Sequence, residues 1–265
     1  MNQRIVSPEV FVEEALAYRY GGRVKLEDIR YSDLALLTIP TIIKVLSEIV
    51  PGIKQVSAWY RSTLPYLIEV SGKRLLIVET LPGAPSAAAV LEELKVCCVK
   101  YVIYCGYVGS LCDDLRPGDV VVVEEAIVDE GVSRIYRPGA TRSFASRKLL
   151  NMVREVLNKL HADYRVVRVW TTDAPYMETV ERVQWFRDVY GCSCVDMETS
   201  ALYTVGTYLG LEVCAVHLVS DQVTERGWYV LFFKEEFKEM RRRFCEILRN
   251  LCVELLTRFK SLSAL

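Results

Sequence analysis

Asp196, Met197 and Glu198 place two carboxylates and a soft apolar side chain where an extended apolar run turns into a helix. Apolar residues at helical spacing follow from residue 201 onward. A carboxylate at such a junction faces the crevice at the carboxyl end of a sheet, where open α/β sheets bind ligands. Glu198 could accept hydrogen bonds from two sugar hydroxyls, and Met197 could pack against the sugar ring. The same residues could instead form only a helix N-terminus, where acidic side chains favour the helix dipole.

A second polar pair, Ser220 and Asp221, ends the apolar stretch 213–219. This stretch is typical of a buried strand whose polar residues appear at its carboxyl end. We expect the two strand ends to lie at the same edge of the sheet. Glu198 would then supply a sugar acceptor, and Asp221 would be a candidate proton donor.

The elements that must position these residues alternate between strand and helix, which favours helices on both faces of a parallel sheet. We predict an α/β fold, namely a single-domain three-layer αβα architecture with a mixed, largely parallel central sheet. The domain would span 1–265, with an N-terminal helical extension over 1–30. The expected strands are 33–38, 56–70, 74–80, 101–105, 119–123, 164–170 and 213–219. The expected helices are 8–18, 40–49, 86–94, 143–160, 179–189, 199–209 and 232–259, the last as one long helix or a pair.

The composition excludes several classes of function. Lys and Arg total 33 against 34 Asp and Glu, so no overall field recruits nucleic acid or an anionic membrane. No apolar run approaches the roughly 20 residues that span a bilayer, and the N-terminus lacks the apolar core of a signal peptide. We therefore expect a cytoplasmic protein, and the 51% hydrophobic content can fill a sizeable core.

The nine cysteines do not form a metal-binding pattern. Cys97 and Cys98 are too close together, and the pair Cys192 and Cys194 has no second pair at finger spacing. We expect no metal and no cofactor. Cys192 and Cys194 would project to the same side of a strand, as two free thiols or as a disulfide.

From about residue 34 to about 237, the chain resembles the nucleoside phosphorylase and nucleosidase superfamily, especially its uridine phosphorylase and hexameric purine nucleoside phosphorylase branches. Each motif is weak alone, but their order and spacing together are specific to this superfamily. The motifs are LPGAPSAAA at 81–89, GYVG at 106–109, RPGDVVVV at 116–123, TDAPY at 172–176, DME at 196–198 and SD at 220–221.

The resemblance implies roles for four residues around the nucleoside. Glu198 would accept hydrogen bonds from the ribose hydroxyls, with Met197 beside the ribose. Asp221 would act at the purine imidazole nitrogen as an acid, for which burial must raise its pKa. Tyr176 would stack near the base, or be only a half-buried loop aromatic. The stretch 177–181 lacks the Gln and Arg pair of uridine-cleaving members, so the resemblance favours a purine.

The resemblance also implies a phosphate site, from which this chain departs. Arg61 matches an arginine that reaches phosphate across a subunit interface, and Gly83, Ser86 and Gly106 could add anion contacts. Two further arginines of phosphorylases are missing, because Ile42 and Tyr104 stand in their places. The glutamate that activates water in nucleosidases is absent as well.

The expected function is cleavage of the N-glycosidic bond of purine nucleosides with phosphate as co-substrate, giving free base and ribose 1-phosphate. A phosphate-independent nucleosidase and a non-catalytic nucleoside-binding paralogue remain alternatives. The expected partners are a nucleoside, phosphate and further copies of the chain, as a dimer or a hexamer built from dimers. His217, inside an apolar run, is interpreted as a core histidine.

Overall fold

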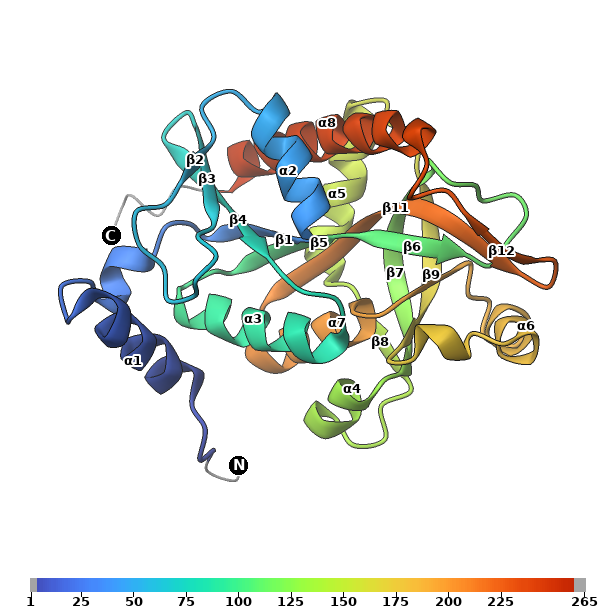
Figure 1. Cartoon of the computed structure of the whole chain (residues 1–265), viewed down its shortest axis with the longest axis horizontal. Coiled ribbons are helices and arrows are strands. Elements are labelled where there is room, and N and C mark those ends of the chain that lie inside the picture. Colours follow the sequence, from blue (N-terminus) through green and yellow to red (C-terminus); the bar gives the residue numbers. More distant parts are fainter. Residues whose placement is uncertain (1–3, 260–265) are drawn as a thin grey trace.

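The computed structural model describes residues 4–259 (Figure 1). Two short 3-10 helices lie at Leu26–Ile29 and Pro175–Met177. The α-helices are α1 (Pro8–Tyr20), α2 (Pro40–Ile49), α3 (Ala84–Val96), α4 (Gly131–Tyr136), α5 (Arg147–Lys159), α6 (Val180–Asp188), α7 (Thr199–Leu209) and α8 (Glu235–Arg258). The strands are β1 (Leu34–Thr38), β2 (Lys54–Gln55), β3 (Tyr66–Val70), β4 (Lys73–Glu79), β5 (Tyr101–Cys105), β6 (Tyr107–Ser110), β7 (Val120–Asp129), β8 (Arg142–Phe144), β9 (Arg165–Thr172), β10 (Cys194–Asp196), β11 (Glu212–Thr224) and β12 (Gly227–Val230).

Within the described residues the strands form one mixed sheet in the order β2-β3-β4-β1-β5-β11-β6-β10-β9-β7-β8, with β12 paired to β11. The strands from β4 through β1, β5 and β11 to β6 are parallel. Antiparallel pairs add β3 at one end and β8 at the other. The long strand β11 also pairs antiparallel with β7, so that β11, β6, β10, β9 and β7 form a closed ring of strands.

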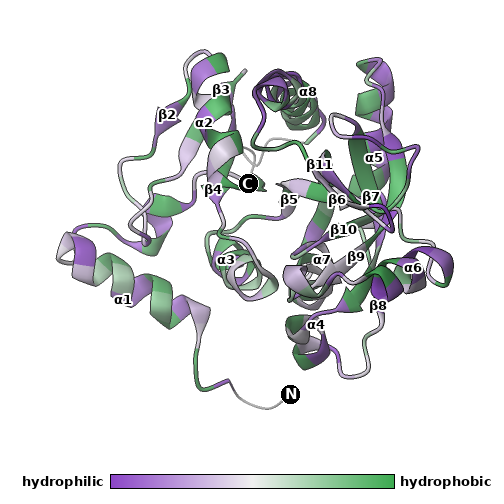
Figure 2. Cartoon of the chain, turned by 45° about the vertical axis from the view of Figure 1, so that its right-hand side comes forward, coloured by the Kyte–Doolittle hydropathy of each residue, from purple (hydrophilic) through white to green (hydrophobic). Residues whose placement is uncertain are grey.

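Helices cover both faces of this sheet. Helices α2, α5 and α8 lie together above it, whereas α3, α4 and α7 lie below it, with α1 packed on α3 (Figure 1). The strands between these layers are largely hydrophobic, and hydrophilic residues gather on the outer surfaces of the helices (Figure 2). The predicted α/β class, with helices on both faces of a mixed central sheet, is confirmed. The closed ring of strands is an addition that the sequence pattern did not predict.

Most predicted elements are present within a few residues of their expected bounds, and 232–259 forms one helix, α8. The predicted strand 56–70 is wrong over 56–65, which is irregular. Its aromatic residues Trp59 and Tyr60 are buried as loop anchors, and the Tyr20 hydroxyl donates to the Trp59 carbonyl. The predicted helix start at Ser143 is also wrong. Ser143 belongs to β8, and Ser146 caps α5 by accepting from the Leu149 N–H.

Strands β2, β6, β8 and β12 and helix α4 were not predicted from the sequence, and the strand predicted over 213–219 ends later than expected. Strand β11 continues through Ser220 and Asp221 to Thr224, where it turns into β12. Asp221 therefore lies inside a strand instead of at its end. A register shift against β6 between Val219 and Asp221 marks a bulge at this position. Such bulges re-aim side chains, and this one places Asp221 in the candidate site described below.

Gly206 lets α7 approach β11 closely. A Cβ atom at this position would lie 2.5 Å from the Val213 Cγ2 atom, which real Cβ atoms do not tolerate. The contact matters for the site because α7 begins directly after Glu198.

We predict that Gly206→Ala destabilises the protein by about 1–3 kcal/mol, the usual cost of overpacking a core. Alanine normally stabilises a helix by about 1 kcal/mol relative to glycine, so a loss of stability in this variant would by itself indicate the clash. Chemical denaturation measures the change. The double variant Gly206→Ala/Val213→Ala relieves the clash and serves as the control. The double variant should lose less unfolding free energy than the two single variants lose together. Strictly additive losses would contradict the proposed contact.

Candidate active site

A cavity of about 490 Å³ opens where β10, β11 and the segment before α3 meet. Its lining brings together four residues expected at the nucleoside, namely Tyr176, Met197, Glu198 and Asp221. No Lys or Arg is among the described residues that line it. The full lining consists of Ile39, Pro82, Tyr104, Tyr107, Gly109, Pro175, Tyr176, Glu178, Val195, Asp196, Met197, Glu198, Ser220, Asp221, Val223, Trp228 and Phe232.

Glu198 is buried at the N-terminal boundary of α7. Its Oε1 atom accepts from the Gly83 N–H at 2.6 Å, and its Oε2 atom accepts from the Met197 N–H at 3.3 Å. Gly83 has φ of 104°, a backbone conformation that only glycine adopts readily. Burial raises the pKa of Glu198 to about 7, helped by the charge of Asp196 and opposed by these N–H donors and the Tyr104 hydroxyl. The remaining acceptor capacity of the carboxylate can hold hydroxyl donors from the cavity.

Asp196 is held by the surrounding chain and is structural. Its Oδ1 atom accepts from the Thr171 hydroxyl at 2.6 Å, and its Oδ2 atom accepts from the N–H and hydroxyl of Thr199. Burial raises the pKa of Asp196 to about 6, and these donors oppose the rise. The Asp196 side chain therefore fixes the turn from β10 into α7 and thereby orients Glu198.

His217 completes the same network from β11. Its Nδ1 atom accepts from the Gly106 N–H at 3.0 Å, and its Nε2 atom lies 3.1 Å from the Thr199 hydroxyl oxygen. Burial lowers the pKa of His217 to about 3, so the ring is neutral at physiological pH and carries its proton on Nε2. The 4.0 Å approach to Asp196 is accordingly not an ion pair. The interpretation of His217 as a hydrogen-bonded core residue is confirmed.

Asp221 lies at the other side of the cavity and accepts two hydrogen bonds. The Trp228 indole N–H donates to its Oδ2 atom at 2.7 Å, and the Ser220 hydroxyl donates to its Oδ1 atom. Trp228 comes from β12, an element that the sequence analysis missed. The Arg226-Gly227 turn followed by two aromatic residues was the available signal for this hairpin.

Tyr176 and Glu178 reach the cavity from the segment between β9 and α6. Tyr176 is 94% exposed and forms part of the rim, so its predicted stacking on a base stays a prediction. Glu178 is half-buried and was not predicted as a site residue. Burial raises the pKa of Glu178 to about 7, as does the charge of Asp221, and Arg182 opposes the rise.

The residues expected to hold phosphate are engaged elsewhere. The Arg61 guanidinium forms a bidentate ion pair with Glu93, at 2.6 and 2.8 Å. The Gly83 and Gly106 N–H groups donate to Glu198 and His217. The Ser86 hydroxyl lies 3.4 Å from that of Thr80. None of the four is among the described residues that line the cavity, and their role with phosphate stays a prediction.

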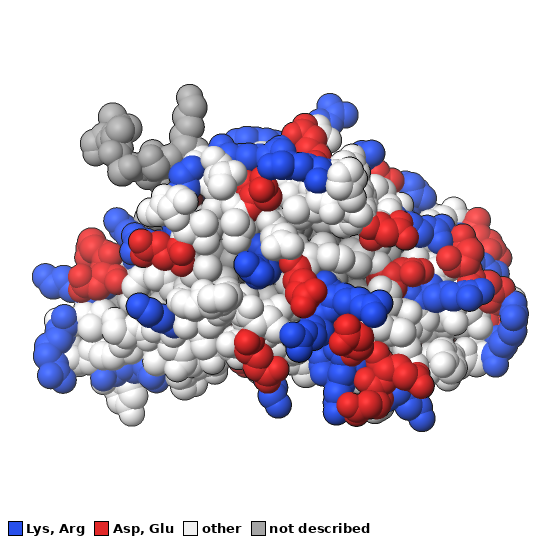
Figure 3. Space-filling model, turned by 90° about the horizontal axis from the view of Figure 1, so that it is seen from above, with Lys and Arg blue, Asp and Glu red and all other residues white. Residues whose placement is uncertain are grey.

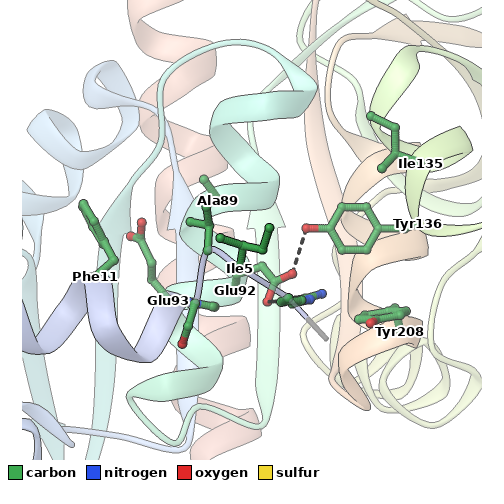
Figure 4. Close-up of a pocket in the computed structure, with 12 residues that line it drawn as sticks. Ile5, Phe11, Ala89, Glu92, Glu93, Ile135, Tyr136 and Tyr208 are labelled. Carbon is green, nitrogen blue, oxygen red and sulfur yellow. Dashed lines mark hydrogen bonds and ion pairs between the residues drawn. The ribbon is translucent and has the colours of Figure 1, made fainter. Parts of the chain in front are cut away.

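Glu93, the ion-pair partner of Arg61, instead lines a second groove beside α3, with a volume of about 910 Å³. Figure 4 shows Glu93 beside Phe11 in this groove, and the Tyr136 hydroxyl donating to Glu92 at 2.7 Å. Exposed apolar side chains surround it, namely Ile5, Val6, Phe11, Ile135 and Tyr208.

Other features of the described chain bear on partners. Lys and Arg are interspersed with Asp and Glu over the face shown in Figure 3. None of the helices within 4–259 has the length and apolar character needed to cross a bilayer.

All nine cysteines are free thiols, and Cys192 and Cys194 are buried. This part of the chain contains no cluster of three His, Cys, Asp or Glu side chains able to hold a metal.

A mixed sheet between two helix layers, with carboxyl groups gathered in a cavity beside two strands, defines an α/β protein with an acidic cavity next to its sheet. The chain belongs to the phosphorylase superfamily, whose family model matches residues 40–256. The resemblance inferred from the sequence motifs is thereby confirmed.

Individual relatives are consistent with this assignment. The chain is 31% identical over 165 residues to a DeoD-type purine nucleoside phosphorylase from Bacillus cytotoxicus, covering 62% of this chain and 70% of the relative. It is similar to a solved uridine phosphorylase from Vibrio fischeri ES114, with a TM-score of 0.72 and 25% identity, covering 91% of this chain and 100% of the other. A purine nucleoside phosphorylase from Toxoplasma gondii shares the fold, with a TM-score of 0.76 and 17% identity over 89% of this chain and 96% of the other.

The burial of Glu198 predicts an unusual stability effect. Because folding raises its pKa from 4.5 to about 7, the folded state disfavours the carboxylate, and this cost grows as pH rises between these values. Glu198→Gln removes the charge but keeps an acceptor for the Gly83 N–H. We expect the variant to melt about 2–4 °C above the native protein at pH 8, as roughly 1 kcal/mol of stabilisation would give.

The difference in melting temperature should shrink as pH approaches 5, where Glu198 is protonated in the folded protein. Glu14→Gln, on the exposed side of α1, is the control and should show no such pH dependence. At each pH, the melting temperature of Glu198→Gln is compared with that of the native protein. If this difference were smaller at pH 8 than at pH 5, burial of the Glu198 charge would not carry the assigned cost in stability.

Proposed function

We propose that this protein cleaves the N-glycosidic bond of purine nucleosides and transfers the ribosyl group to phosphate. The observation that carries the proposal is that Glu198 and Asp221, from two different strands, line one cavity. Membership of the phosphorylase superfamily and the similarity to a purine nucleoside phosphorylase support it.

The electrostatics of the cavity suit this chemistry. Cleavage gives the ribose oxocarbenium character, so positive charge develops on the sugar in the transition state. The cavity holds the carboxyl groups of Glu178, Asp196, Glu198 and Asp221. A fixed set of acidic groups in a half-closed site stabilises developing positive charge, because no solvent has to reorganise. Glu198 would hold the ribose hydroxyls, and Met197 would pack beside the ring.

The base would occupy the side of the cavity formed by Asp221, Glu178 and Trp228. Acidic side chains suit a purine, whose ring nitrogens accept a proton as the base departs. The stretch 177–181 offers a carboxylate where uridine-cleaving relatives have an amide and a guanidinium. These residues support a purine over a pyrimidine.

A second candidate is hydrolysis, with water replacing phosphate as the acceptor. The observation that favours it is the lack of Lys and Arg among the described lining residues. A phosphate dianion would enter an acidic cavity, and burying a charge without a partner is costly. Phosphorolysis therefore requires a cation from outside this lining, for which Arg61 of an adjoining subunit is the candidate.

We expect the native protein to release purine base from inosine or adenosine, with ribose 1-phosphate as the sugar product in phosphate buffer. Base release and the sugar product are measured with and without phosphate, by absorbance and chromatography. Glu198→Gln is the matched inactive control and should lose at least about tenfold, since a lost charged hydrogen bond costs about 1.5–3 kcal/mol.

The products separate the candidates. Free ribose at high phosphate would exclude phosphorolysis and favour the nucleosidase. If no base is released while a nucleoside raises the melting temperature, the protein is a nucleoside-binding paralogue.

We further propose that the active form is a homo-oligomer in which Arg61 serves the cavity of an adjoining subunit. The Arg61 side chain is 35% exposed, and its ion-pair partner Glu93 lines the apolar groove of Figure 4, which a second copy of the chain would cover. Arg61→Gln keeps a hydrogen-bond donor to Glu93 but lacks the charge. We expect it to lose phosphorolysis alone, and to regain part of it when mixed with Glu198→Gln.

The rescue has a simple geometric basis. In a mixed oligomer, one cavity combines the native Glu198 of the first variant with the native Arg61 of the second. Light scattering gives the oligomeric state, and each variant mixed with itself is the control. A monomer with full activity, or mixing without rescue, would contradict a shared site.

A further inference from the structure

The three consecutive arginines of α8 have different surroundings. Arg242 pairs with Glu246 at 3.6 Å and Arg243 pairs with Glu239 at 3.2 Å, both on the exposed side of the helix. Arg241 is half-buried and forms no ion pair with a carboxylate of the described chain. Its Nε atom is buried and has no hydrogen-bond partner among the described residues. Because burying a cation without an anion costs free energy, the anion for Arg241 is expected to be a ligand.

The helical spacing of α8 turns Arg241 toward the cavity. Phe237, one turn before it, is fully buried and packs edge-on against the Tyr107 ring, with ring centres 5.3 Å apart. Cys245, one turn after it, is fully buried as well. Residues four apart share one face of a helix, so Arg241 lies on the face of α8 that packs toward β6. Tyr107 belongs to β6 and lines the cavity.

The Tyr107 hydroxyl connects this cation with a second polar group. It lies 3.0 Å from the Thr41 hydroxyl, in the first turn of α2. Burial raises the pKa of Tyr107, and the Thr41 hydroxyl and the Arg241 cation oppose the rise. The Tyr107 side chain is therefore a neutral donor with a positive charge close by, and it reaches from the cavity wall toward α8.

The first turn of α2 contributes to the same surface. Its cap residue Ile39 lines the cavity and offers no side-chain hydrogen bond to the N–H groups of the turn. The turn contains no acidic residue. The partial positive charge of a helix N-terminus favours an anion. A cation, two hydroxyls and a helix N-terminus thus surround Tyr107, and all of them favour an anionic ligand.

We propose that Arg241, Tyr107 and Thr41 form a subsite that holds a phosphate dianion at the cavity, with Arg241 as the cation from within the same chain. This inference rests on the proposed function, because it supplies the positive charge that the acidic lining lacks for phosphorolysis. Ile42 and Tyr104 stand where phosphorylases have arginines, so the charge comes here from a different element, α8. It acts together with Arg61 of an adjoining subunit.

The test measures the binding of inorganic phosphate by calorimetry, without a nucleoside. We expect Arg241→Met to raise the Kd for phosphate by about 10–100-fold, the loss expected for one charged hydrogen bond. Arg241→Lys keeps the charge but lacks the planar fork, and it should lose less. Arg242→Met, on the exposed side of the same helix, is the matched control and should bind phosphate as the native protein does. An unchanged Kd in Arg241→Met would overturn the proposal.

Stability distinguishes a binding role from a structural one. In phosphate-free buffer Arg241→Met should melt at or above the native temperature, because it removes a cation that lacks a partner. Added phosphate should raise the melting temperature of the native protein and not that of the variant. A variant that melts lower but binds phosphate normally would overturn the proposal, because Arg241 would then serve the fold alone.

Tyr107→Phe provides a second variant in case Arg241→Met does not fold. It removes the hydroxyl but keeps the ring that packs against Phe237. We expect the Kd for phosphate to rise by about 3–10-fold, the loss expected for one neutral hydrogen bond. An unchanged Kd in this variant would contradict a subsite built around Tyr107.

Rates of base release separate this inference from the proposed function. Arg241→Met should raise the KM for phosphate and leave the KM for inosine near its native value. If the native protein binds phosphate through Arg241 but releases no base, the proposed function fails and the subsite remains. If base is released at a rate that neither phosphate nor Arg241→Met changes, the nucleosidase is favoured and the subsite is wrong. A loss of binding seen with inosine 5′-monophosphate but not with inorganic phosphate would also overturn the assignment to the co-substrate.

Discussion

The interaction on which the site depends is the compensation of buried carboxyl groups by neutral N–H and O–H donors. Without a cation in the described lining, each ionised group needs donors that the fold must supply. The N-terminus of α3 supplies the Gly83 N–H to Glu198, and α7 supplies Thr199 to Asp196. The β12 hairpin supplies the Trp228 indole N–H to Asp221. Leaving a buried charge unpaired costs free energy, so these hydrogen bonds stabilise the arrangement of three elements that are far apart in sequence around one cavity.

The same compensation decides which chemistry the cavity favours. Tyr104 stands where phosphorylases have an arginine, and burial raises its pKa well above 10, so its hydroxyl remains a neutral donor near Glu198. A neutral donor orients the carboxylate without cancelling its charge. The cavity therefore favours a group that becomes positively charged and disfavours an anion. Any anionic co-substrate depends on a charge from elsewhere, which makes the surroundings of Arg61 as important as the cavity itself.

The sequence predicted the fold class and most elements, because alternating strand and helix patterns and the family motifs extend over much of the chain. It also predicted that Glu198 and Asp221 share a site, since both follow buried apolar runs. It could not predict that β11 continues past Asp221 through a bulge, because polar residues inside a strand resemble a strand end. Trp228 was missed because its importance comes from its hydrogen bond to Asp221. Glu178 was missed because it enters the cavity from an irregular segment, which no local pattern marks as part of a site.

The path of β11 constrains how the protein is made. Strand β11 lies between β5 and β6, which are consecutive in sequence, and it also closes the ring of strands by pairing with β7. During synthesis, the ribosome releases β5, β6 and β7 long before Glu212–Thr224 emerges. Their hydrogen-bonding edges stay open until most of the chain is complete, and open edges invite pairing with other chains. The nascent chain therefore exposes these strand edges until the late arrival of β11 completes the sheet and the cavity together.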